Sequence, residues 1–313
     1  MVRFIELLDT GKEDKEKKGV ISEVKREVRP LYERGVNFIK TLSGPEIDLE
    51  SGLKFIKEII DDEEILLGLT EEVVRPVPKD AVLLPHPVNV AILSLKLGKA
   101  LKYSKDQLLE LGTAALLHDI GMRDIPLKVL CKQKKLNKEV LELIKVHPEV
   151  GRDIVKKEVG EAIIADAVFQ EHERIGGQGY PQGLRGEQIH EYAKIIGLTD
   201  TYEALIHQRP YRSKLLPDMA LMEIIDKHKE YFLPKLLKTF FQTVTPYPVG
   251  SLIILNNGQI GKVIATNSLQ PLKPTIEVLY DEKGERLKSP LIITLSDYPL
   301  LKIVGFYNEK GNF

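Results

Sequence analysis

The sequence has little cysteine, no tryptophan and no long apolar run. The single cysteine, Cys131, cannot form an internal disulfide, which favours a reducing compartment. No stretch approaches the roughly 18 apolar residues that a membrane-spanning helix needs. The first residues also lack the basic and then apolar pattern of a signal peptide. We therefore expect a cytoplasmic protein without a membrane span.

The sequence also lacks an excess of charge of either sign. Its 313 residues include 45 Lys and Arg against 46 Asp and Glu, which gives a formal net charge of -1. A nearly neutral chain has no overall field that would attract a nucleic-acid polymer or an anionic membrane. We therefore expect no nucleic-acid partner, and an anionic ligand would have to be held by a local site.

Hydrophobic periodicity changes along the chain and predicts a mainly α protein with a small β-rich part. We expect a charged and then helical segment over residues 1–61, a helical domain over residues 62–243 and a β-rich domain over residues 244–313. The last part should form a small barrel or sandwich, and it contains neither His nor Cys, which favours a structural or partner-binding role. Its expected strands are 252–255, 260–265, 276–280, 291–295 and 301–306.

Capping side chains mark two of the expected helices. Asp48 should cap a helix that ends near Asp61, and Ser104 with Gln107 three residues later matches a capping box. The helix after Ser104 is apolar nearly all round, so it should lie at the centre of the helical domain. In the N-terminal segment, Pro30 predicts a boundary.

Polar residues at the ends and on the apolar faces of these helices carry the chemical signal. His118 and Asp119 follow Leu116 and Leu117, and burying them without partners would cost free energy. Asp200 lies in a helical row with apolar residues, where a buried carboxylate requires a cation. Further donors of this kind are His86, His147, Glu171 and His172.

These donors predict a pair of divalent metal ions. One ion would be held by His86, His118, Asp119 and Asp200, and the other by His147, His172 and Glu171, with Asp119 as the bridge. Nitrogen and carboxylate donors without thiolates favour iron or manganese over structural zinc. Two ions about 3.5 to 4 Å apart can polarise a phosphoryl group and deprotonate a water, which suits phosphoester hydrolysis.

Each histidine alone has a plainer explanation. A single histidine such as His86 or His147 is more often a helix cap or a hydrogen-bonded core residue than a metal ligand. We assign His190, His207 and His228 to that plainer class. His118 followed by Asp119 at the end of a buried helix is more specific.

Four motifs, in this order, resemble the signatures of HD-GYP domains. They are His118-Asp119-Ile120-Gly121, then His147-Pro148-Glu149-Val150-Gly151, then His172-Glu173-Arg174 running into Gly177-Gln178-Gly179-Tyr180-Pro181, and finally Asp200 with Arg209-Pro210-Tyr211-Arg212. The resemblance covers residues 62–243. The tail that begins Tyr247-Pro248-Val249-Gly250 is similar to tails on some members.

The resemblance implies an HD-type helical bundle and a bacterial phosphodiesterase that opens cyclic di-GMP to pGpG or onward to GMP. It makes metal ligands of His86, His118, Asp119, His147, His172 and Asp200, with Asp119 as the bridge that activates water. The residues Gly179, Tyr180 and Pro181 would border the substrate. Arg209 or Arg212 would face its phosphates, a role that suits the guanidinium group.

This chain departs from the family pattern at four positions. Glu171 stands where the first of two consecutive histidines is usual, so it supplies a hard anionic donor. Met122 replaces a common lysine, which leaves a cationic phosphate contact to Arg123 or another residue. Gly176 replaces an expected Asp, and Val82 stands where three-metal members have an acidic residue. Two ions are therefore expected rather than three.

Two other functions remain open. An HD-type phosphohydrolase for another nucleotide or phosphoester would share the metal ligands but use other substrate contacts. A catalytically weak cyclic di-GMP sensor or scaffold is favoured by Met122 and opposed by the full ligand set. The expected partners are therefore a cyclic dinucleotide or other phosphoester, and a signalling protein or a second copy of the chain.

Overall fold

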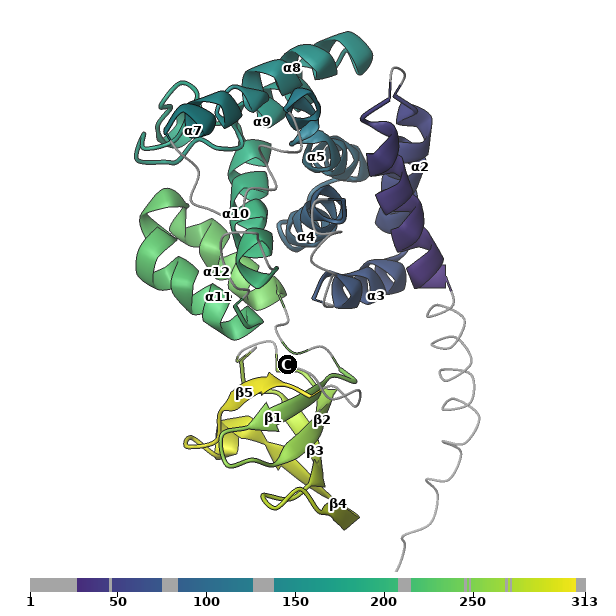
Figure 1. The fold of residues 1–313 in the computed structure, drawn as a ribbon, viewed down its shortest axis with the longest axis vertical. Coiled ribbons are helices and arrows are strands. Elements are labelled where there is room, and N and C mark those ends of the chain that lie inside the picture. The colour runs from purple at the N-terminus through teal and green to yellow at the C-terminus, as the bar shows by residue number, and fades with distance from the viewer. Residues whose placement is uncertain are drawn as a thin grey trace, which may run out of the picture.

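The structure is a computed structural model of the whole chain. It describes residues 27–44, 47–74, 84–125, 138–207, 215–244, 247, 249–267, 270 and 272–307. Cys131, Val82, Arg209 and Arg212, and residues 1–26 of the N-terminal segment, lie outside the described residues. Figure 1 shows that the helices gather in one body and the strands in another.

The N-terminal part is helical and packs on the rest of the helical body. Residues 27–41 are helical and include Pro30, so the boundary expected there is wrong. A proline removes one backbone hydrogen bond, but its neighbours still propagate the helix here. Two further helices follow, α2 (Leu49–Asp61) and α3 (Glu63–Val73). The expected cap is confirmed, because Asp48 accepts a hydrogen bond from the backbone N–H of Ser51 at 3.2 Å.

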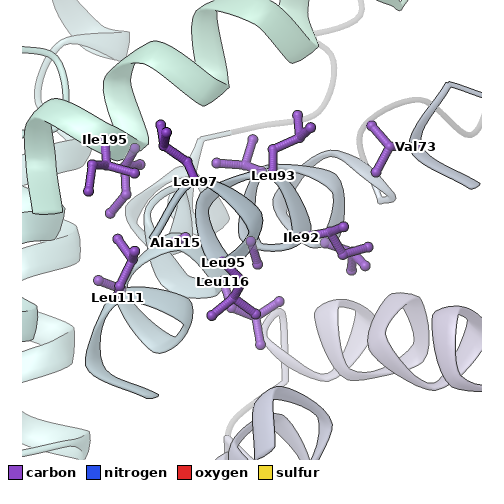
Figure 2. Close-up of a cluster of buried hydrophobic side chains, with 14 of the residues drawn as sticks. Val73, Ile92, Leu93, Leu95, Leu97, Leu111, Ala115, Leu116 and Ile195 are labelled. Atoms are coloured by element: carbon purple, nitrogen blue, oxygen red, sulfur yellow. The ribbon is translucent and has the colours of Figure 1, made fainter. Parts of the chain in front are cut away.

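Two central helices carry most of the apolar core. They are α4 (His86–Ala100) and α5 (Lys105–Leu117). Both bury side chains on nearly every face, as expected for α5, and Ser104 and Gln107 form the predicted capping box. Leu97, Leu111 and Ile195 lie at the meeting of these helices with the later part of the chain (Figure 2), and all three are fully buried.

The remaining helices close the body around this pair. They are α7 (Lys138–Ile144), α8 (His147–Glu158), α9 (Ala162–Gln170), α10 (Glu191–Ile206), α11 (Pro217–Glu223) and α12 (Pro234–Thr243). Shorter helical turns are η2 (Ile120–Asp124), η3 (Gly186–Gln188), η4 (Ile224–His228) and η5 (Lys229–Tyr231). In this body α10 packs against α4 and α9, and α8 packs against α9 and η2. Among the described residues, the helices lack the combination of length and hydropathy that a bilayer span requires.

The C-terminal part is a five-stranded antiparallel sheet in the order β4-β3-β2-β1-β5. Its strands are β1 (Leu252–Leu255), β2 (Ile260–Ala265), β3 (Thr275–Tyr280), β4 (Arg286–Thr294) and β5 (Ile303–Phe306), with η6 (Leu295–Asp297) after β4. The expected mainly α protein with a small β-rich part is confirmed. In the described region β4 and β5 stand at the two ends of the order, so the sheet is not closed as a barrel.

Strand β4 begins earlier than expected, at Arg286, which pairs with Tyr280 of β3. Arg286, Lys288 and Ser289 have exposed side chains, so their polar composition hid the strand in the sequence. The apolar residues of the sheet form a core of their own, separate from the core of the helices. The boundaries at residues 61 and 243 stay predictions.

Candidate metal centre

The turn after α5 brings the first two donors to the centre. Helix α5 ends at Leu117, and His118 and Asp119 lie in the turn before η2. Gly121 allows η2 to approach the start of α8, because a Cβ at this position would lie 2.0 Å from the carbonyl oxygen of His147. Only glycine fits such an approach. As a result, Asp119 Oδ1 lies 3.5 Å from His147 Nε2.

The first donor group combines residues of three segments, which are α4, the turn that follows α5, and α10. Asp119 Oδ2 lies 3.5 Å from Nε2 of both His86 and His118. Asp200 Oδ1 lies 3.2 Å from His86 Nε2. The donor atoms of His86, His118 and Asp119 are all within 4.8 Å of one another, a separation that a single cation can span.

The second donor group joins the start of α8 and the end of α9. Glu171 Oε1 lies 3.3 Å from His147 Nε2 and 3.2 Å from His172 Nε2. These three donor atoms also lie within 4.8 Å of one another. Asp119 stands between the groups, with one carboxylate oxygen toward each. The structure therefore brings together all seven side chains that the sequence suggested as ligands.

Hydrogen bonds donated by Nδ1 orient three of the histidine rings. His118 Nδ1 donates to the carbonyl oxygen of Ala115 at 2.8 Å, and His147 Nδ1 donates to that of Ile144 at 2.7 Å. His86 Nδ1 donates to Glu203 Oε2 at 2.5 Å. Carbonyl and carboxylate oxygens only accept, so each Nδ1 carries a proton. In the neutral form of each ring this proton position places the lone pair on Nε2, the atom that would bind a metal.

Unsatisfied donor atoms show that these residues fit a cation. Among the described residues, His118 Nε2 and Glu171 Oε2 are buried and have no hydrogen-bond partner. Such buried polar atoms are costly. One atom belongs to each donor group, and each can offer an electron pair. A bound divalent metal would therefore supply the partner that these atoms lack in the protein.

The charges around Asp119 and Asp200 keep both carboxylates ionised. Burial raises the pKa of Asp119, but the nearby His118, His147 and His86 lower it more, so the pKa falls below its ordinary value. Burial likewise opposes ionisation of Asp200, and the hydrogen bond and charge of His86 outweigh it. At neutral pH both groups are therefore in the form that a metal ligand requires.

A family model described as an HD domain matches residues 54–236, more than half of the chain. The chain belongs to the HD domain family. This confirms the resemblance to HD-GYP domains. Membership of the family implies that the chain binds divalent metal, and the two donor groups are the candidates for holding it. A second model, described as a KOW domain associated with HD domain, matches residues 252–311.

Curated relatives of this HD domain protein include several phosphodiesterases. Cyclic di-GMP phosphodiesterase PA4108 of Pseudomonas aeruginosa is 32% identical over 201 residues, which is 64% of this chain and 48% of the relative. Cyclic di-GMP phosphodiesterase PdeB of Borreliella burgdorferi is 30% identical over 194 residues, 62% of this chain and 51% of the relative. The chain spans about half the length of these two relatives.

The HD fold is also shared with a solved structure. Bd1817, an HDG"Y"P protein from Bdellovibrio bacteriovorus, matches with a TM-score of 0.57 at 20% sequence identity. The match covers 69% of this chain and 71% of that chain. At this identity the likeness shows the fold, and the donor groups of this chain have to be assessed from its own residues.

A buried glutamate anchors the glycine-rich loop between α9 and η3, which contains Gly177, Gly179 and Gly183. The carboxylate of Glu173, which is 4% exposed, accepts hydrogen bonds from three consecutive backbone N–H groups. These belong to Gln182, Gly183 and Leu184, at 2.7, 3.1 and 2.9 Å. The loop is therefore tied directly to the residue that follows His172 of the second donor group.

The loop places Tyr180 beside the second donor group. Its ring stacks on the ring of His172, with 4.6 Å between centroids. Gly179 permits this close return of the chain, since a Cβ there would lie 2.4 Å from the carbonyl oxygen of His172. Of the expected substrate residues, Gly179 and Tyr180 thus lie beside the second donor group, and Pro181 follows them in the same loop at an exposed position.

The described cations near the centre are not those expected. The guanidinium of Arg123 donates to the carbonyl oxygen of Gly44 at 2.6 Å, which ties it to the end of the N-terminal helical stretch. Instead, the ammonium of Lys145 lies over the ring of Tyr180, 5.9 Å from its centroid. Lys145 is not among the residues expected from the sequence, although it precedes His147 by only two residues.

Sequence reasoning also missed Glu203. This residue is 1% exposed and lies three positions after Asp200 in α10, on the same face of the helix. That spacing was the available signal. His207, placed in the plainer class, contacts Glu203 Oε1 through Nδ1 at 3.0 Å. His190 caps α10, as expected of that class, by accepting from the N–H of Tyr192.

Proposed function

We propose that this HD domain protein is a dinuclear-metal phosphodiesterase that hydrolyses cyclic di-GMP to pGpG, GMP or both. One observation carries the proposal: two separate donor groups share Asp119, with one oxygen toward each. The relatives named cyclic di-GMP phosphodiesterases support the choice of substrate. The donor types support iron or manganese.

The division of the ligands follows from the distances between their donor atoms. The first metal would take His86, His118 and Asp200, the second would take His147, Glu171 and His172, and Asp119 would bridge them. Two divalent ions, when bound, polarise the phosphoryl group and lower the pKa of a water. The protein's own contribution is to hold the ligands in place and keep their carboxylates charged.

Substrate binding would use the loop beside the second donor group. The Tyr180 ring offers an apolar face next to His172, and Lys145 offers a positive charge above that ring. The Lys145 side chain is 44% exposed and pairs with Glu142 at 2.9 Å, so it can turn toward an anion. We propose that Lys145 supplies the phosphate contact that Met122 does not.

The proposed location and partners rest on the sequence. A single cysteine supports a cytoplasmic location. The β-rich part, which lacks His and Cys, would contact a signalling protein or a second copy of the chain. His207 is bonded to Glu203 and 4% exposed, which supports the structural role expected for it.

The test is a hydrolysis and binding screen on the full chain under anaerobic conditions with Fe²⁺ or Mn²⁺. We expect hydrolysis of cyclic di-GMP and about two metals per chain. Hydrolysis of another nucleotide alone would favour an HD-type phosphohydrolase of different specificity. Tight binding of cyclic di-GMP without turnover would favour the sensor. An absence of metal binding would contradict the dinuclear site itself.

The Lys145→Ala variant tests the substrate contact. Losing one charge-assisted contact to a phosphate should raise KM for cyclic di-GMP about tenfold with little change in kcat. The matched control is Lys156→Ala, which removes an exposed lysine farther along α8. If both variants have the same KM for cyclic di-GMP, Lys145 does not contact the substrate.

A further inference from the structure

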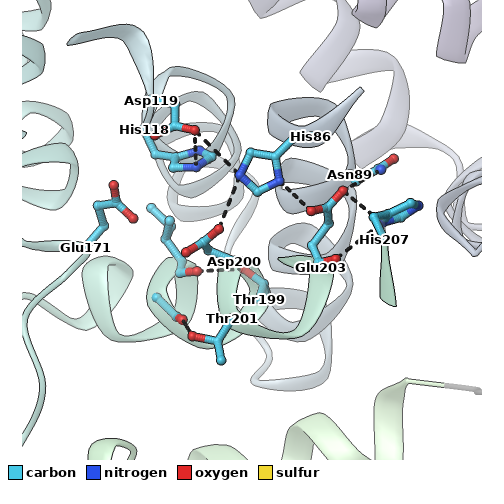
Figure 3. Close-up of polar contacts among 12 residues, drawn as sticks. His86, Asn89, His118, Asp119, Glu171, Thr199, Asp200, Thr201, Glu203 and His207 are labelled. Atoms are coloured by element: carbon cyan, nitrogen blue, oxygen red, sulfur yellow. Dashed lines mark hydrogen bonds and ion pairs between the residues drawn. The ribbon is translucent and has the colours of Figure 1, made fainter. Parts of the chain in front are cut away.

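A line of buried hydrogen bonds leads from the N-terminal helical stretch to the metal ligand His86. Tyr32 Oη donates to Asn89 Oδ1 at 2.7 Å, and Asn89 Nδ2 donates to Glu203 Oε1 at 3.0 Å. Glu203 Oε2 then accepts from His86 Nδ1 at 2.5 Å. Figure 3 shows Asn89 and Glu203 on one side of the His86 ring and Asp119 and Asp200 on the other.

The direction of each hydrogen bond is set by its neighbours. Glu203 accepts at both oxygens: Oε2 faces His86 Nδ1 at 2.5 Å, and Oε1 faces Asn89 Nδ2 and His207 Nδ1, each at 3.0 Å. It therefore requires a proton on His86 Nδ1. Because the Glu203 carboxylate only accepts, the Asn89 amide turns its Nδ2 toward Glu203, and its Oδ1 is left to accept from Tyr32. The hydroxyl of Tyr32 thus holds the outer end of the amide in this orientation.

His86 differs in this respect from two other ligands. His118 and His147 are oriented by backbone carbonyl oxygens of Ala115 and Ile144, which no substitution removes. The acceptor for His86 is a side chain more than a hundred positions away. The tautomer of His86 therefore depends on the packing of α10 against α4, and on the N-terminal helical stretch that supports Asn89.

We propose that Glu203 and Tyr32 are positioning residues for the metal centre. Glu203 keeps the proton of His86 on Nδ1, so that Nε2 presents its lone pair to the metal. Tyr32 donates to Oδ1 of Asn89 and so holds this amide against Glu203. Residues 27–41, which precede the segment matched by the HD family model, are thereby part of the support of the first metal. The inference rests on the metal centre of the proposed function.

The two test variants remove one link each. In Glu203→Gln the amide can accept at only one of its two ends, so its NH₂ group faces either His86 or the pair Asn89 and His207. We expect a 10- to 100-fold loss of affinity for one of the two metals, as is typical when a group that orients a ligand is removed. In Tyr32→Phe the Asn89 amide loses one bond, and we expect a loss of about three- to tenfold.

The measurement is calorimetric titration of the chelator-treated full chain with Mn²⁺, beside the thermal midpoint of unfolding without metal. The matched control is Tyr192→Phe, which removes a tyrosine hydrogen bond of the same 2.7 Å length, to Glu110. Support for the inference is weaker binding of one ion in Tyr32→Phe and Glu203→Gln, with Tyr192→Phe like the parent. Should Glu203→Gln fail to fold, Tyr32→Phe decides.

Two results would overturn the inference. One is a Tyr32→Phe protein that binds both ions as tightly as a metal-binding parent, which would leave the proposed function standing. The other is an equal loss in Tyr32→Phe and Tyr192→Phe, which would indicate a general effect on packing. A parent that binds no Mn²⁺ would instead refute the dinuclear centre, and the inference with it.

Discussion

The helical and β-rich parts of this protein bury different kinds of side chain. Among the described residues, every buried polar or charged side chain outside the tyrosines lies between Thr70 and His207. The described β-rich part buries aliphatic residues such as Ile253 and Val263 together with Tyr247. Half of the buried polar set in the helical part consists of His, Glu or Asn residues at or next to the metal centre, such as His118, Glu171 and Asn89.

This difference separates function from stability. Burying ionisable groups opposes folding unless each is paired, so the helical part bears a cost that the β-rich part does not. The helical part offsets that cost with a large apolar core around α4 and α5. Loss of a buried group should therefore affect metal binding in one part and only folding in the other.

The largest expected effect is that of Asp119→Ala. This carboxylate turns one oxygen toward each donor group, so both metals should be lost and hydrolysis should fall on the order of a thousandfold, as when a group that stabilises transition-state charge is removed. Metal content by elemental analysis and a steady-state assay measure this. Asp153→Ala, at an exposed position of α8, is the control. Full activity of the Asp119 variant would contradict the shared site.

The next effect should be confined to the β-rich part. Ile253 is fully buried at the centre of the sheet core, so Ile253→Ala should lower the free energy of unfolding of this part by about 2 to 4 kcal/mol. Metal content should stay at the parent value. Val304→Ala, which changes a half-exposed side chain of β5, should have little effect. Metal loss in the Ile253 variant would couple the two parts.

A smaller effect concerns pH and Lys96, a partly buried lysine of α4. Burial lowers the pKa of Lys96 to about 8, below its value in an unfolded chain. Between these values the unfolded chain binds more protons, so the stability of the helical part should rise with pH, by about 1 kcal/mol from pH 8 to pH 9. Denaturant unfolding at each pH measures this. In Lys96→Met this rise in the free energy of unfolding between pH 8 and pH 9 should vanish. If the variant shows the same rise as the parent, another group is responsible for it.

The smallest expected effect is that of removing the β-rich part. All proposed ligands precede residue 246, and the two apolar cores are separate, so deletion of residues 246–313 should leave a folded helical domain with the metal content of the full chain. Circular dichroism and elemental analysis test this. A soluble truncated protein without metal would show that the β-rich part helps to build the centre.

Much of the centre could be predicted because its signals are local. His118 and Asp119 stand next to each other after a buried helix, and Glu171 and His172 stand next to each other after another. The structure adds residues whose hydrogen-bond partners are distant in the sequence. Tyr32, Asn89 and Glu203 meet across 57 and 114 positions of sequence, and none has a neighbour in the chain that indicates its partner.

The sequence by itself determined the order of helices and strands and the residue types that meet at the centre, because periodicity, caps and short motifs act within a few residues. Only the tertiary structure decided which atoms face one another. It turned Arg123 toward Gly44 and Lys145 over Tyr180, and it set the proton of His86 by packing Glu203 against it. Such choices depend on how α4, α10 and the N-terminal helical stretch pack, which is a property of the whole apolar core rather than of any segment.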